Sequence, residues 1–314
     1  MSSKPRSRRH LFTVLTPTYN RADTLPRVYA SLTEQTFQDF EWVVIDDGSS
    51  DNTREVVQAW QQQARFPIRY IWQTNQHKKA AFNRGVAESS GELVVALDSD
   101  DSLDLNALDA MARAWQGIPE RERSRYVAIT GLCARPNGSI VGDMFPQDEF
   151  DATAIDMSFK YRVGGEKFGC MSVDVLRQFP FPEDIAGFVP ESLVWRAIAR
   201  AGYLTRFVNQ VFRTYYDSAD SLSAQGRASG AQHAAGLWLL AQDTVVECLP
   251  WFRYQPAEFF KAAARYTRFA MHLKHDGAKL PLAGRRLKGL GARVLVGLMW
   301  PVGAMLYWRD RRRA

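Results

Sequence analysis

Short apolar runs alternate with amphipathic segments from residue 12 to about residue 132. The apolar runs are rich in β-branched and aromatic residues and predict five strands, at 12–16, 42–45, 68–73, 93–97 and 126–132. The segments between them predict four helices, at 25–33, 53–63, 80–89 and 106–116. Strands that are apolar without alternation and are separated by helices are typical of a parallel sheet covered on both faces. The expected fold class is therefore α/β, with a mostly parallel central sheet flanked by helices.

The positive charge of the chain is concentrated at its two ends. The net charge is +6, but residues 1–10 carry +4 and residues 285–314 carry +7, which leaves −5 on the rest. The globular body is therefore not expected to bind nucleic acid. Residues 1–10 lack the apolar stretch of a signal peptide and predict a basic disordered arm. The three cysteines, Cys133, Cys170 and Cys248, are far apart and fit a reducing cytoplasm rather than a disulfide framework or a zinc site.

Polar residues follow three of the predicted strands where each strand ends, in the segments 16–21, 46–51 and 98–101. Ligands bind beyond the carboxyl ends of the strands in sheets of this type. Asp98 and Asp100 lie on the same side of an extended chain and suit Mg²⁺ or Mn²⁺ that also binds a diphosphate. The alternative is that Asp101 or Ser102 caps the next helix.

The first two strand ends carry groups that suit a nucleotide base. An aspartate in Asp46-Asp47-Gly48 can accept a hydrogen bond from the imide N–H of a uracil-type base, although Asp-Gly is also a common turn. Tyr19 offers a flat face on which a base can stack, although a lone tyrosine more often serves packing.

Three runs together resemble the family 2 glycosyltransferases: TPTYNRADTL at 16–25, WVVIDDGSSDNT at 42–53 and AAFNRGVAESSGELVVALDSDD at 80–101. The resemblance implies a GT-A fold and inverting transfer of a sugar from a nucleoside-diphosphate sugar, with a UDP-sugar favoured. By position, Tyr19 and Asp47 match base-contacting residues, and Asp100 matches the aspartate that binds Mg²⁺ or Mn²⁺. The expected donor-binding residues are Thr16, Tyr19, Arg21, Asp46, Asp47, Lys79, Asn83, Asp98 and Ser99.

The resemblance also implies a catalytic base, which in this family is the second acid of a Glu-Asp pair at the start of a helix. Aligning Trp195 and Gly202 with the family pattern places Glu191 at that position, with Pro190 in place of the first acid. A glutamate can perform the same proton transfer from an acceptor hydroxyl. The alternative is that Glu191 is an acidic first-turn residue favoured by the dipole of a helix over 191–201.

Other segments depart from the family pattern or extend it. The Tyr-Arg-x-His motif is Phe-Arg-Thr-Tyr at 212–215, so the expected metal affinity is weak, resting on Asp100, the diphosphate and water. Arg213, Lys78 or Lys79 is expected either to steady the leaving phosphates or to lie on a solvated basic face. Residues 217–223 resemble a loop that closes over the donor, and 160–169 are expected to face the acceptor. The Gln-x-x-Arg-Trp motif of processive synthases is absent from the sequence, which favours addition of one sugar.

The expected domain organisation has four parts. After the arm come a glycosyltransferase domain at 11–225, divided near residue 132 into donor and acceptor halves, a helical extension at 226–280 and a tail at 281–314. Short strands are expected at 205–209 and 211–215, and helices within 229–274.

The tail has fifteen uncharged, mostly apolar residues, Val294–Trp308, between basic flanks. This run is shorter than the ~20 residues that span a bilayer, and Pro301 is expected to break it. We therefore expect a re-entrant or interfacial anchor at the inner face of the cell membrane. A helix packed on the body or in a dimer is the alternative, and the oligomeric state stays open.

The sequence thus predicts a cytoplasmic, membrane-associated enzyme that glycosylates a lipid-linked or growing glycan. The resemblance implies a role in surface polysaccharide biosynthesis. One alternative is a nucleotidyltransferase, but the run after the first strand, TPTYNRADT, has no glycine to cradle a triphosphate. The other is a catalytically silent sugar-nucleotide-binding or scaffold protein.

Overall fold

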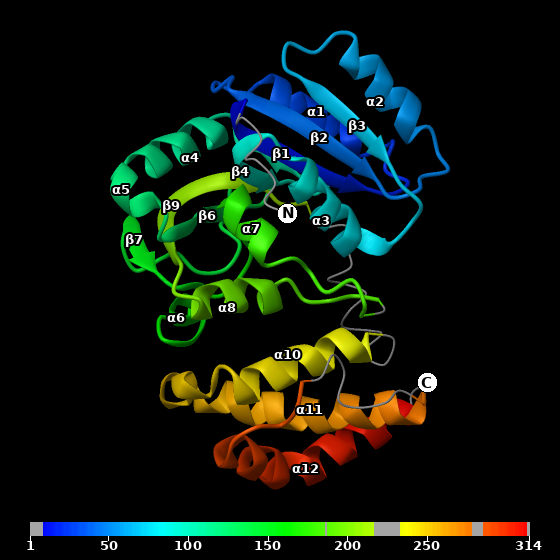
Figure 1. The fold of residues 1–314 in the computed structure, drawn as a ribbon, viewed down its shortest axis with the longest axis vertical. Helices are drawn as coiled ribbons and strands as arrows, with labels where there is room; N and C mark the ends of the chain where they lie inside the picture. Colours follow the sequence, from blue (N-terminus) through cyan, green and yellow to red (C-terminus); the bar gives the residue numbers. More distant parts are fainter. Residues whose placement is uncertain (1–8, 186, 217–232, 278–284, 313–314) are drawn as a thin grey trace, which may run out of the picture. The chain divides into compact units, whose positions relative to one another are not determined.

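The computed structural model describes residues 9–185, 187–216, 233–277 and 285–312 (Figure 1). The chain divides into two compact units. The first unit holds the described residues within 1–154, 163–180 and 198–218, and the second holds those within 155–162, 181–197 and 219–314. The segment that contains Glu191 therefore groups with the C-terminal helices.

The first unit is built on one sheet, whose strand order is β3-β2-β1-β4-β8-β6-β9-β5, with β7 paired to β9. Strands β1 to β4 are mutually parallel, β6 is parallel to β9, and β5, β7 and β8 are antiparallel to their neighbours. The strands are β1 (His10–Thr18), β2 (Phe40–Asp46), β3 (Ile68–Trp72), β4 (Gly91–Ala96), β5 (Ser102–Leu103), β6 (Tyr126–Ala134), β7 (Glu149–Ala152), β8 (Lys167–Ser172) and β9 (Leu204–Thr214). All five strands predicted before residue 133 are confirmed, whereas β5, β7 and β8 were not predicted.

The expectation of two short strands at 205–209 and 211–215 is wrong, because both ranges belong to or adjoin the single strand β9. The chain forms one strand of 11 residues, and its pairing with β6 shifts register near residues 208–211. The polar pair Asn209-Gln210 interrupts the apolar pattern at this irregularity, and the backbone continues through it as a bulge.

Helices surround the sheet of the first unit, and α3 packs against β1 and β2. These helices are α1 (Leu25–Thr33), α2 (Thr53–Gln61), α3 (His77–Glu88), α4 (Ala107–Gln116), α5 (Glu120–Arg123) and α7 (Val173–Gln178). The predicted helices are confirmed, but α3 begins three residues before the predicted start and so includes Lys78 and Lys79. Gly85 lets α3 approach the sheet, because a Cβ there would lie 2.1 Å from a methyl carbon of Leu15.

The second unit is helical. Its helices are α6 (Ala154–Phe159), most of α8 (Ser192–Arg200), α10 (Ala234–Val246), the 3-10 helix η1 (Leu249–Tyr254), α11 (Pro256–His275) and α12 (Leu290–Arg311). Helix α11 packs against both α10 and α12. The helical prediction for 229–274 is confirmed over the described residues, with Pro256 at the start of α11, where its missing N–H costs no hydrogen bond.

Helix α12 corrects two expectations for the tail. It is continuous over 22 residues, so Pro301 does not break it, and it is the one described helix long and apolar enough to cross a membrane. A proline inside a helix costs ~3 kcal/mol, which packing on α11 can offset. Tyr307 is buried in that packing, and Asp310 accepts hydrogen bonds of 2.5 and 2.8 Å from Arg268 of α11.

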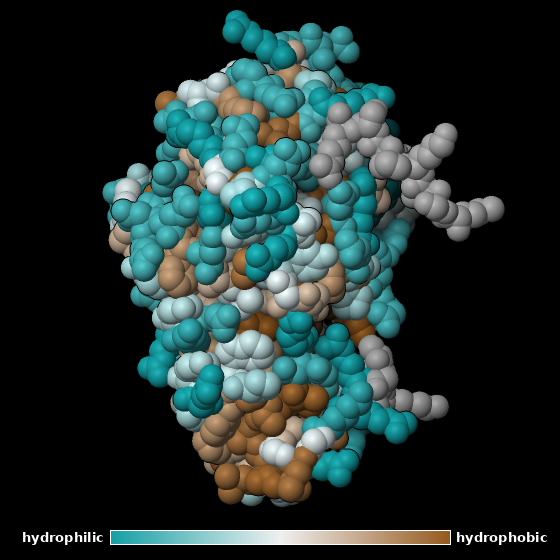
Figure 2. Space-filling model, turned by 60° about the vertical axis from the view of Figure 1, so that its left-hand side comes forward, coloured by the Kyte–Doolittle hydropathy of each residue, from teal (hydrophilic) through white to brown (hydrophobic). Residues whose placement is uncertain are grey.

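The other face of α12 is apolar and exposed. Figure 2 shows this face as the brown area at the lower end of the molecule. Its exposed large side chains are Leu290, Val294, Leu298, Trp300, Val302, Met305 and Trp308. We call these seven residues the α12 apolar face.

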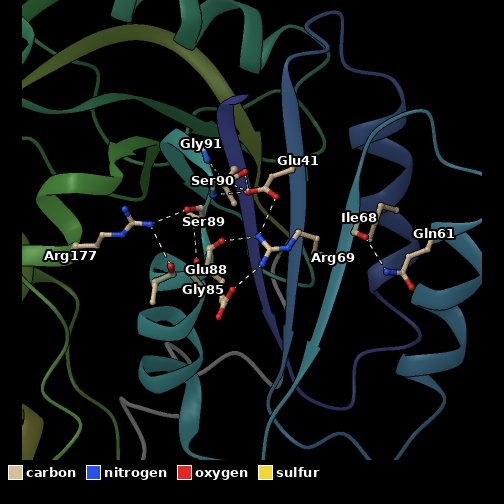
Figure 3. A network of polar contacts seen from close by, with 12 residues as sticks. Glu41, Gln61, Ile68, Arg69, Gly85, Glu88, Ser89, Ser90, Gly91 and Arg177 are labelled. Carbon is tan, nitrogen blue, oxygen red and sulfur yellow. Dashed lines mark hydrogen bonds and ion pairs between the residues drawn. The ribbon is translucent and has the colours of Figure 1, made fainter. Parts of the chain in front are cut away.

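Hydrogen bonds and ion pairs connect residues near the amino ends of the parallel strands (Figure 3). The buried Glu41 carboxylate accepts hydrogen bonds from the Thr13 hydroxyl (2.7 Å) and from the backbone N–H and hydroxyl of Ser90 (2.8 Å each). Arg69 bridges Glu41 at 3.4 Å and Glu88 at 2.9 Å. Burial raises the pKa of Glu41, but these hydrogen bonds and Arg69 outweigh it and hold that pKa below its ordinary value. This end of the sheet is therefore tied together by its own side chains.

Candidate functional site

The carboxyl ends of β1, β2 and β4 are neighbours. Strand β1 pairs with β2 on one side and with β4 on the other, so the order of the strands reverses at β1. The Asp47 N–H donates to the Thr18 carbonyl at 2.8 Å, and the Leu97 N–H donates to the Leu15 carbonyl at 2.9 Å. The predicted segments 16–21, 46–51 and 98–101 therefore meet at one edge, at the kind of reversal where α/β sheets bind ligands.

The loops after β1 and β2 are bonded to each other. The Asn20 side-chain oxygen accepts from the Ser50 N–H, and the Ser49 hydroxyl accepts from the Asn20 N–H, both at 2.8 Å. Asn20 adopts a φ of 51°, a conformation that asparagine tolerates better than most residues. Tyr19 directly precedes Asn20, which makes these two hydrogen bonds, and is 50% exposed. Tyr19 therefore extends from a loop held by hydrogen bonds, and half of the residue is exposed to solvent.

Asp46 and Asp47 are buried and accept hydrogen bonds in the turn after β2. Asp46 accepts from the Tyr70 hydroxyl and from the Ser49 N–H (2.8 Å). One Asp47 oxygen accepts from the Gln73 side chain at 2.7 Å and the Gln76 N–H at 2.9 Å. Burial and the Asp46 carboxylate raise the pKa of Tyr70 to about 12, so its hydroxyl stays a donor.

Gly48 makes the turn possible. Its φ is +87°, and a Cβ there would lie 3.0 Å from the backbone nitrogen of Asn75. The sequence therefore identified the turn correctly as Asp-Asp-Gly. The contributions of Gln73 and Gln76 were missed, because these two residues belong to a loop beyond β3 with no recognisable motif.

The other predicted donor-binding residues differ in exposure. Thr16 is fully buried, and its hydroxyl accepts from the Trp42 indole at 3.0 Å, so its side chain already has an internal role. Arg21 is half-buried. Lys79 is buried and Asn83 half-buried on α3, and Ser99 is buried after β4. Among the described residues, the buried Thr18 hydroxyl has no hydrogen-bond partner, which marks a polar atom in this region that the sequence did not single out.

Cations lie among the acidic residues after β4. Lys78 Nζ is 2.7 Å from Asp98, and Arg213 is 3.1 Å from Asp101, 3.5 Å from Glu166 and 3.7 Å from Asp98. Arg213 is buried, so the expectation of a solvated basic face is wrong for this residue. The cause is that β9 pairs with β6 and β5 and thereby carries Arg213 into the sheet beside the carboxylates.

The pKa values of Asp98 and Asp101 shift in opposite directions. Burial raises the pKa of Asp98, but Lys78 and Arg213 outweigh it and lower that pKa below its ordinary value. Burial raises the pKa of Asp101 to about 7, and Asp98 and Asp100 add to the rise while Arg213 opposes it. Asp98 is thus held as a carboxylate, whereas Asp101 is poised near neutral pH.

Asp100 lies half-buried between these residues, and its backbone carbonyl accepts a 2.6 Å hydrogen bond from Arg27. Within the part of the chain that the structure describes, no group of three or more His, Cys, Asp or Glu side chains is placed to hold a metal ion. Asp98, the other carboxylate of the motif, is already paired with Lys78. The residues present therefore fit a divalent ion only if most of its ligands come from a bound diphosphate and water.

Glu191 lies just before α8 and is exposed. Its backbone carbonyl accepts from the N–H groups of Val194 (2.9 Å) and Trp195 (3.2 Å), so it opens the first turn. Glu191 belongs to the second unit, whereas the residues after β1, β2 and β4 belong to the first. The segment 217–223 and residues 1–8 of the predicted arm lie outside the described residues.

Comparison with known proteins agrees with this geometry. The sequence model of the family described as "Glycosyl transferase family 2" matches residues 13–120. This range includes most of β1, all of β2 to β4, and the three strand ends. Residues 13–120 therefore form a glycosyl transferase family 2 domain.

Among proteins similar to this chain, a putative teichuronic acid biosynthesis glycosyltransferase, TuaG of Bacillus subtilis, is 23% identical over 273 residues, covering 83% of this chain and 94% of TuaG. The GalNAc(5)-diNAcBac-PP-undecaprenol beta-1,3-glucosyltransferase of Campylobacter jejuni is 28% identical over 207 residues, 64% of this chain and 63% of that protein. An uncharacterised Nostoc glycosyltransferase is 41% identical over 103 residues, and the match spans only 32% of its length.

Solved structures confirm the predicted GT-A fold. S. aureus TarS 1-349 in complex with UDP-GlcNAc has a TM-score of 0.57 at 17% identity, covering 95% of this chain and 81% of that one. The mannosyltransferase PcManGT from Pyrobaculum calidifontis, in complex with GDP-Man and Mn²⁺, has a TM-score of 0.54 at 20% identity, covering 97% of this chain and 83% of that one.

Proposed function

We propose that this chain is an inverting glycosyltransferase that moves one sugar from a UDP-sugar to a hydroxyl of a lipid-linked or growing glycan. The observation that carries the proposal is the adjacency of the three strand ends that hold Tyr19, Asp47 and Asp98–Asp100. The UDP-GlcNAc complex of TarS supports the choice of donor. The names of the Bacillus and Campylobacter relatives support a role in surface polysaccharide biosynthesis.

In the proposed donor site, the half-exposed Tyr19 ring stacks on the base, and Asp47 accepts from its imide N–H. The hydrogen bonds from Gln73 and Gln76 to Asp47 orient the carboxylate for this contact. The cationic Lys79 and Arg21 lie on segments adjoining the strand ends and balance phosphate charge.

In the proposed reaction, Glu191 accepts the proton of the acceptor hydroxyl. The hydroxyl oxygen forms a bond to the anomeric carbon while the bond from that carbon to the diphosphate oxygen breaks, and the diphosphate takes the electron pair. Attack opposite the leaving group inverts the anomeric configuration. The exposure of Glu191 at the start of α8 supports this role, since its carboxylate is accessible to an incoming hydroxyl.

We further propose that Asp100 holds Mg²⁺ or Mn²⁺ together with the donor diphosphate, and Mn²⁺ in the PcManGT complex supports such an ion. When bound, the ion neutralises charge that develops on the leaving diphosphate. Because the described residues offer few ligands, we expect the ion to bind tightly only with the donor.

We also propose that the α12 apolar face rests on the inner surface of the cell membrane. Its apolar side chains are exposed, and Arg309, Arg311 and Arg312 follow at the end of the tail, where they suit anionic headgroups. The inner side of α12 is occupied by α11, which supports an orientation in the membrane plane rather than across it.

A thermal-shift panel with UDP, UDP-GlcNAc, UDP-glucose and GDP-mannose, with and without Mn²⁺, tests the donor site. We expect the uridine compounds to raise Tm, and Mn²⁺ to increase the shift. A ligand at 100 times its Kd stabilises the fold by about 2.7 kcal/mol. If no nucleotide raises Tm at millimolar concentration, the proposed donor site is wrong.

A further inference from the structure

Gly236 of α10 lies directly against the segment that leads into Glu191. A Cβ on Gly236 would lie 2.0 Å from the carbonyl oxygen of Phe188 and 3.1 Å from Cδ of Pro190. Glycine is otherwise unfavourable inside a helix, since it costs more conformational entropy than alanine. The close approach of two backbones therefore accounts for glycine at this position.

Two more contacts continue the same interface. The rings of Phe188 and His233, the residue just before α10, are in edge contact with centroids 5.7 Å apart. Further along, Arg196 of α8 donates a 2.8 Å hydrogen bond to the Thr244 hydroxyl. Arg196 also lies 3.6 Å from the fully buried carboxylate of Asp243.

The order of these contacts shows that the segment 188–196 runs along α10 in the same direction. Phe188 meets the beginning of α10, and Arg196 meets its last two turns. Glu191 lies between the two attachment points. Val189 and Pro190 are buried whereas Glu191 is exposed, so buried residues hold the chain directly before the exposed Glu191.

Helix α10 is itself held firmly. It packs on α11, and Trp238, Leu239 and Val245 are buried with it. A helix that is apolar nearly all round belongs inside a structure, and so α10 offers a rigid support.

We propose that α10 is the positioning element for Glu191, with Gly236, Thr244 and Asp243 as its positioning residues. This inference rests on the proposed function, because it assigns the C-terminal helical extension a part in the same transfer reaction. A base must lie within hydrogen-bond reach of the proton that it takes, and a displacement of 1 Å can reduce the rate about 100-fold. The extension thereby acts on kcat through the position of Glu191.

The test compares Gly236→Ala with Gly303→Ala. A Cβ on Gly303 of α12 would lie 2.5 Å from the Ala264 carbonyl oxygen, so the control introduces a similar clash in the same unit, away from residues 188–196. We expect both variants to have a lower Tm. Only Gly236→Ala should lower kcat at least about tenfold, with the donor KM within about twofold, and kcat of Gly303→Ala should stay within about twofold.

Hydrogen exchange measured by mass spectrometry gives a readout that does not need transfer. Gly236→Ala should accelerate amide exchange in 187–197 at least about tenfold, whereas Gly303→Ala should leave that segment unchanged. Thr244→Val keeps the side-chain shape and removes the acceptor for Arg196. It should accelerate exchange in 187–197 and lower kcat in the same way but less strongly. This variant still tests the inference if Gly236→Ala does not fold.

Equal kcat losses in Gly236→Ala and Gly303→Ala, or a normal kcat in Gly236→Ala despite faster exchange, would overturn the inference. So would normal exchange and kcat in Thr244→Val if Gly236→Ala does not fold. Absence of transfer by the unsubstituted chain would count against the proposed function instead, and the exchange data would still decide whether α10 holds the segment.

Discussion

Arg213 lies 3.1 Å from the Asp101 carboxylate, and both side chains are almost fully buried, at 6% and 3% exposed. The same guanidinium contacts Asp98 and Glu166. Arg213 therefore joins β9 to the acidic segment after β4 and to the segment before β8. Arg213 thus compensates several carboxylates in this part of the first unit, and Lys78 is a second cation beside Asp98.

Replacing Arg213 by Met should destabilise the fold, because it leaves the buried Asp101 carboxylate without this cation and removes one of the cations beside Asp98. Removing one partner of a buried ion pair costs about 3–5 kcal/mol. Urea denaturation measures the free energy of unfolding directly. Arg121→Met on α5 is the control, because that side chain is 85% exposed and its change should stay within about 0.5 kcal/mol. A loss below about 1 kcal/mol in Arg213→Met would show that the cluster compensates its charge in another way.

Replacing Tyr19 by Ala should weaken binding of the uridine donor with little effect on stability. Stacking of a base on an aromatic ring is worth about 1–3 kcal/mol, or roughly 5- to 150-fold in Kd. Since Tyr19 is 50% exposed, the fold does not depend on its ring. Isothermal titration with UDP measures the change, and Leu105→Ala, at a side chain 51% exposed, is the matched control. An unchanged Kd would remove Tyr19 from the donor site.

Replacing Glu191 by Gln should abolish transfer and preserve donor binding. A positioned general base contributes about 10²–10⁴ to the rate, so kcat should fall by that factor while the Kd for UDP stays the same. Glu183→Gln is the control and should keep full activity, because Glu183 is an exposed acidic residue in the same segment between α7 and α8. Transfer that survives Glu191→Gln would mean that another group is the base or that the sugar transfer needs none.

The donor half of the fold was readable from sequence because each element has a local cause. The apolar run at the centre of β2, a strand whose seven residues are all buried, and the glycine that allows the turn at Gly48 are visible in the chain itself. The partners of Asp47 were not visible, since Gln73 and Gln76 reach it only through the pairing of β2 with β3. The burial of Arg213 likewise depends on long-range pairing of β9.

For the tail, the rules based on local sequence gave a wrong prediction. Local rules for Pro301 and for the length of the uncharged run predicted a broken, short helix, but packing on α11 stabilises a longer one. Propensity is a weak guide where tertiary contacts cover one face of an element. The expected role of Glu191 stays a prediction, because it rests on the resemblance to the family pattern.

Replacing Leu298 and Met305 by Glu should release the chain from membranes. Both side chains belong to the α12 apolar face, at 65% and 61% exposed, and burying such a side chain in an apolar phase is worth about 1.5–3 kcal/mol. Flotation with vesicles that contain anionic lipid should therefore fall by more than tenfold. Leu105→Glu, on an exposed residue of the first unit, is the control.

Sedimentation velocity on the same samples separates the membrane from a second copy of the chain. Loss of a dimer in the double variant, with no vesicle binding by the unsubstituted chain, would make the α12 apolar face a protein interface. Vesicle binding that resists the double variant would also contradict the proposal.

Replacing Glu41 by Gln should destabilise the fold at neutral pH by about 1.5–3 kcal/mol, the range for hydrogen bonds to a charged group. The pKa of Glu41 lies below its ordinary value of 4.5 in the folded chain. Its stabilising contribution is therefore complete above pH 4.5, and it is lost as the pH falls through the lowered pKa, because the unfolded chain takes up the proton first.

The difference in unfolding free energy between the unsubstituted chain and Glu41→Gln should accordingly be constant from pH 5 to pH 8 and shrink below about pH 4.5. Glu34→Gln, at an exposed carboxylate after α1, should show a difference near zero over the whole range. Urea denaturation at several pH values measures both curves. A difference that grows on acidification would mean that the network of Thr13, Ser90 and Arg69 stabilises the protonated side chain, contrary to the hydrogen bonds in which Glu41 only accepts.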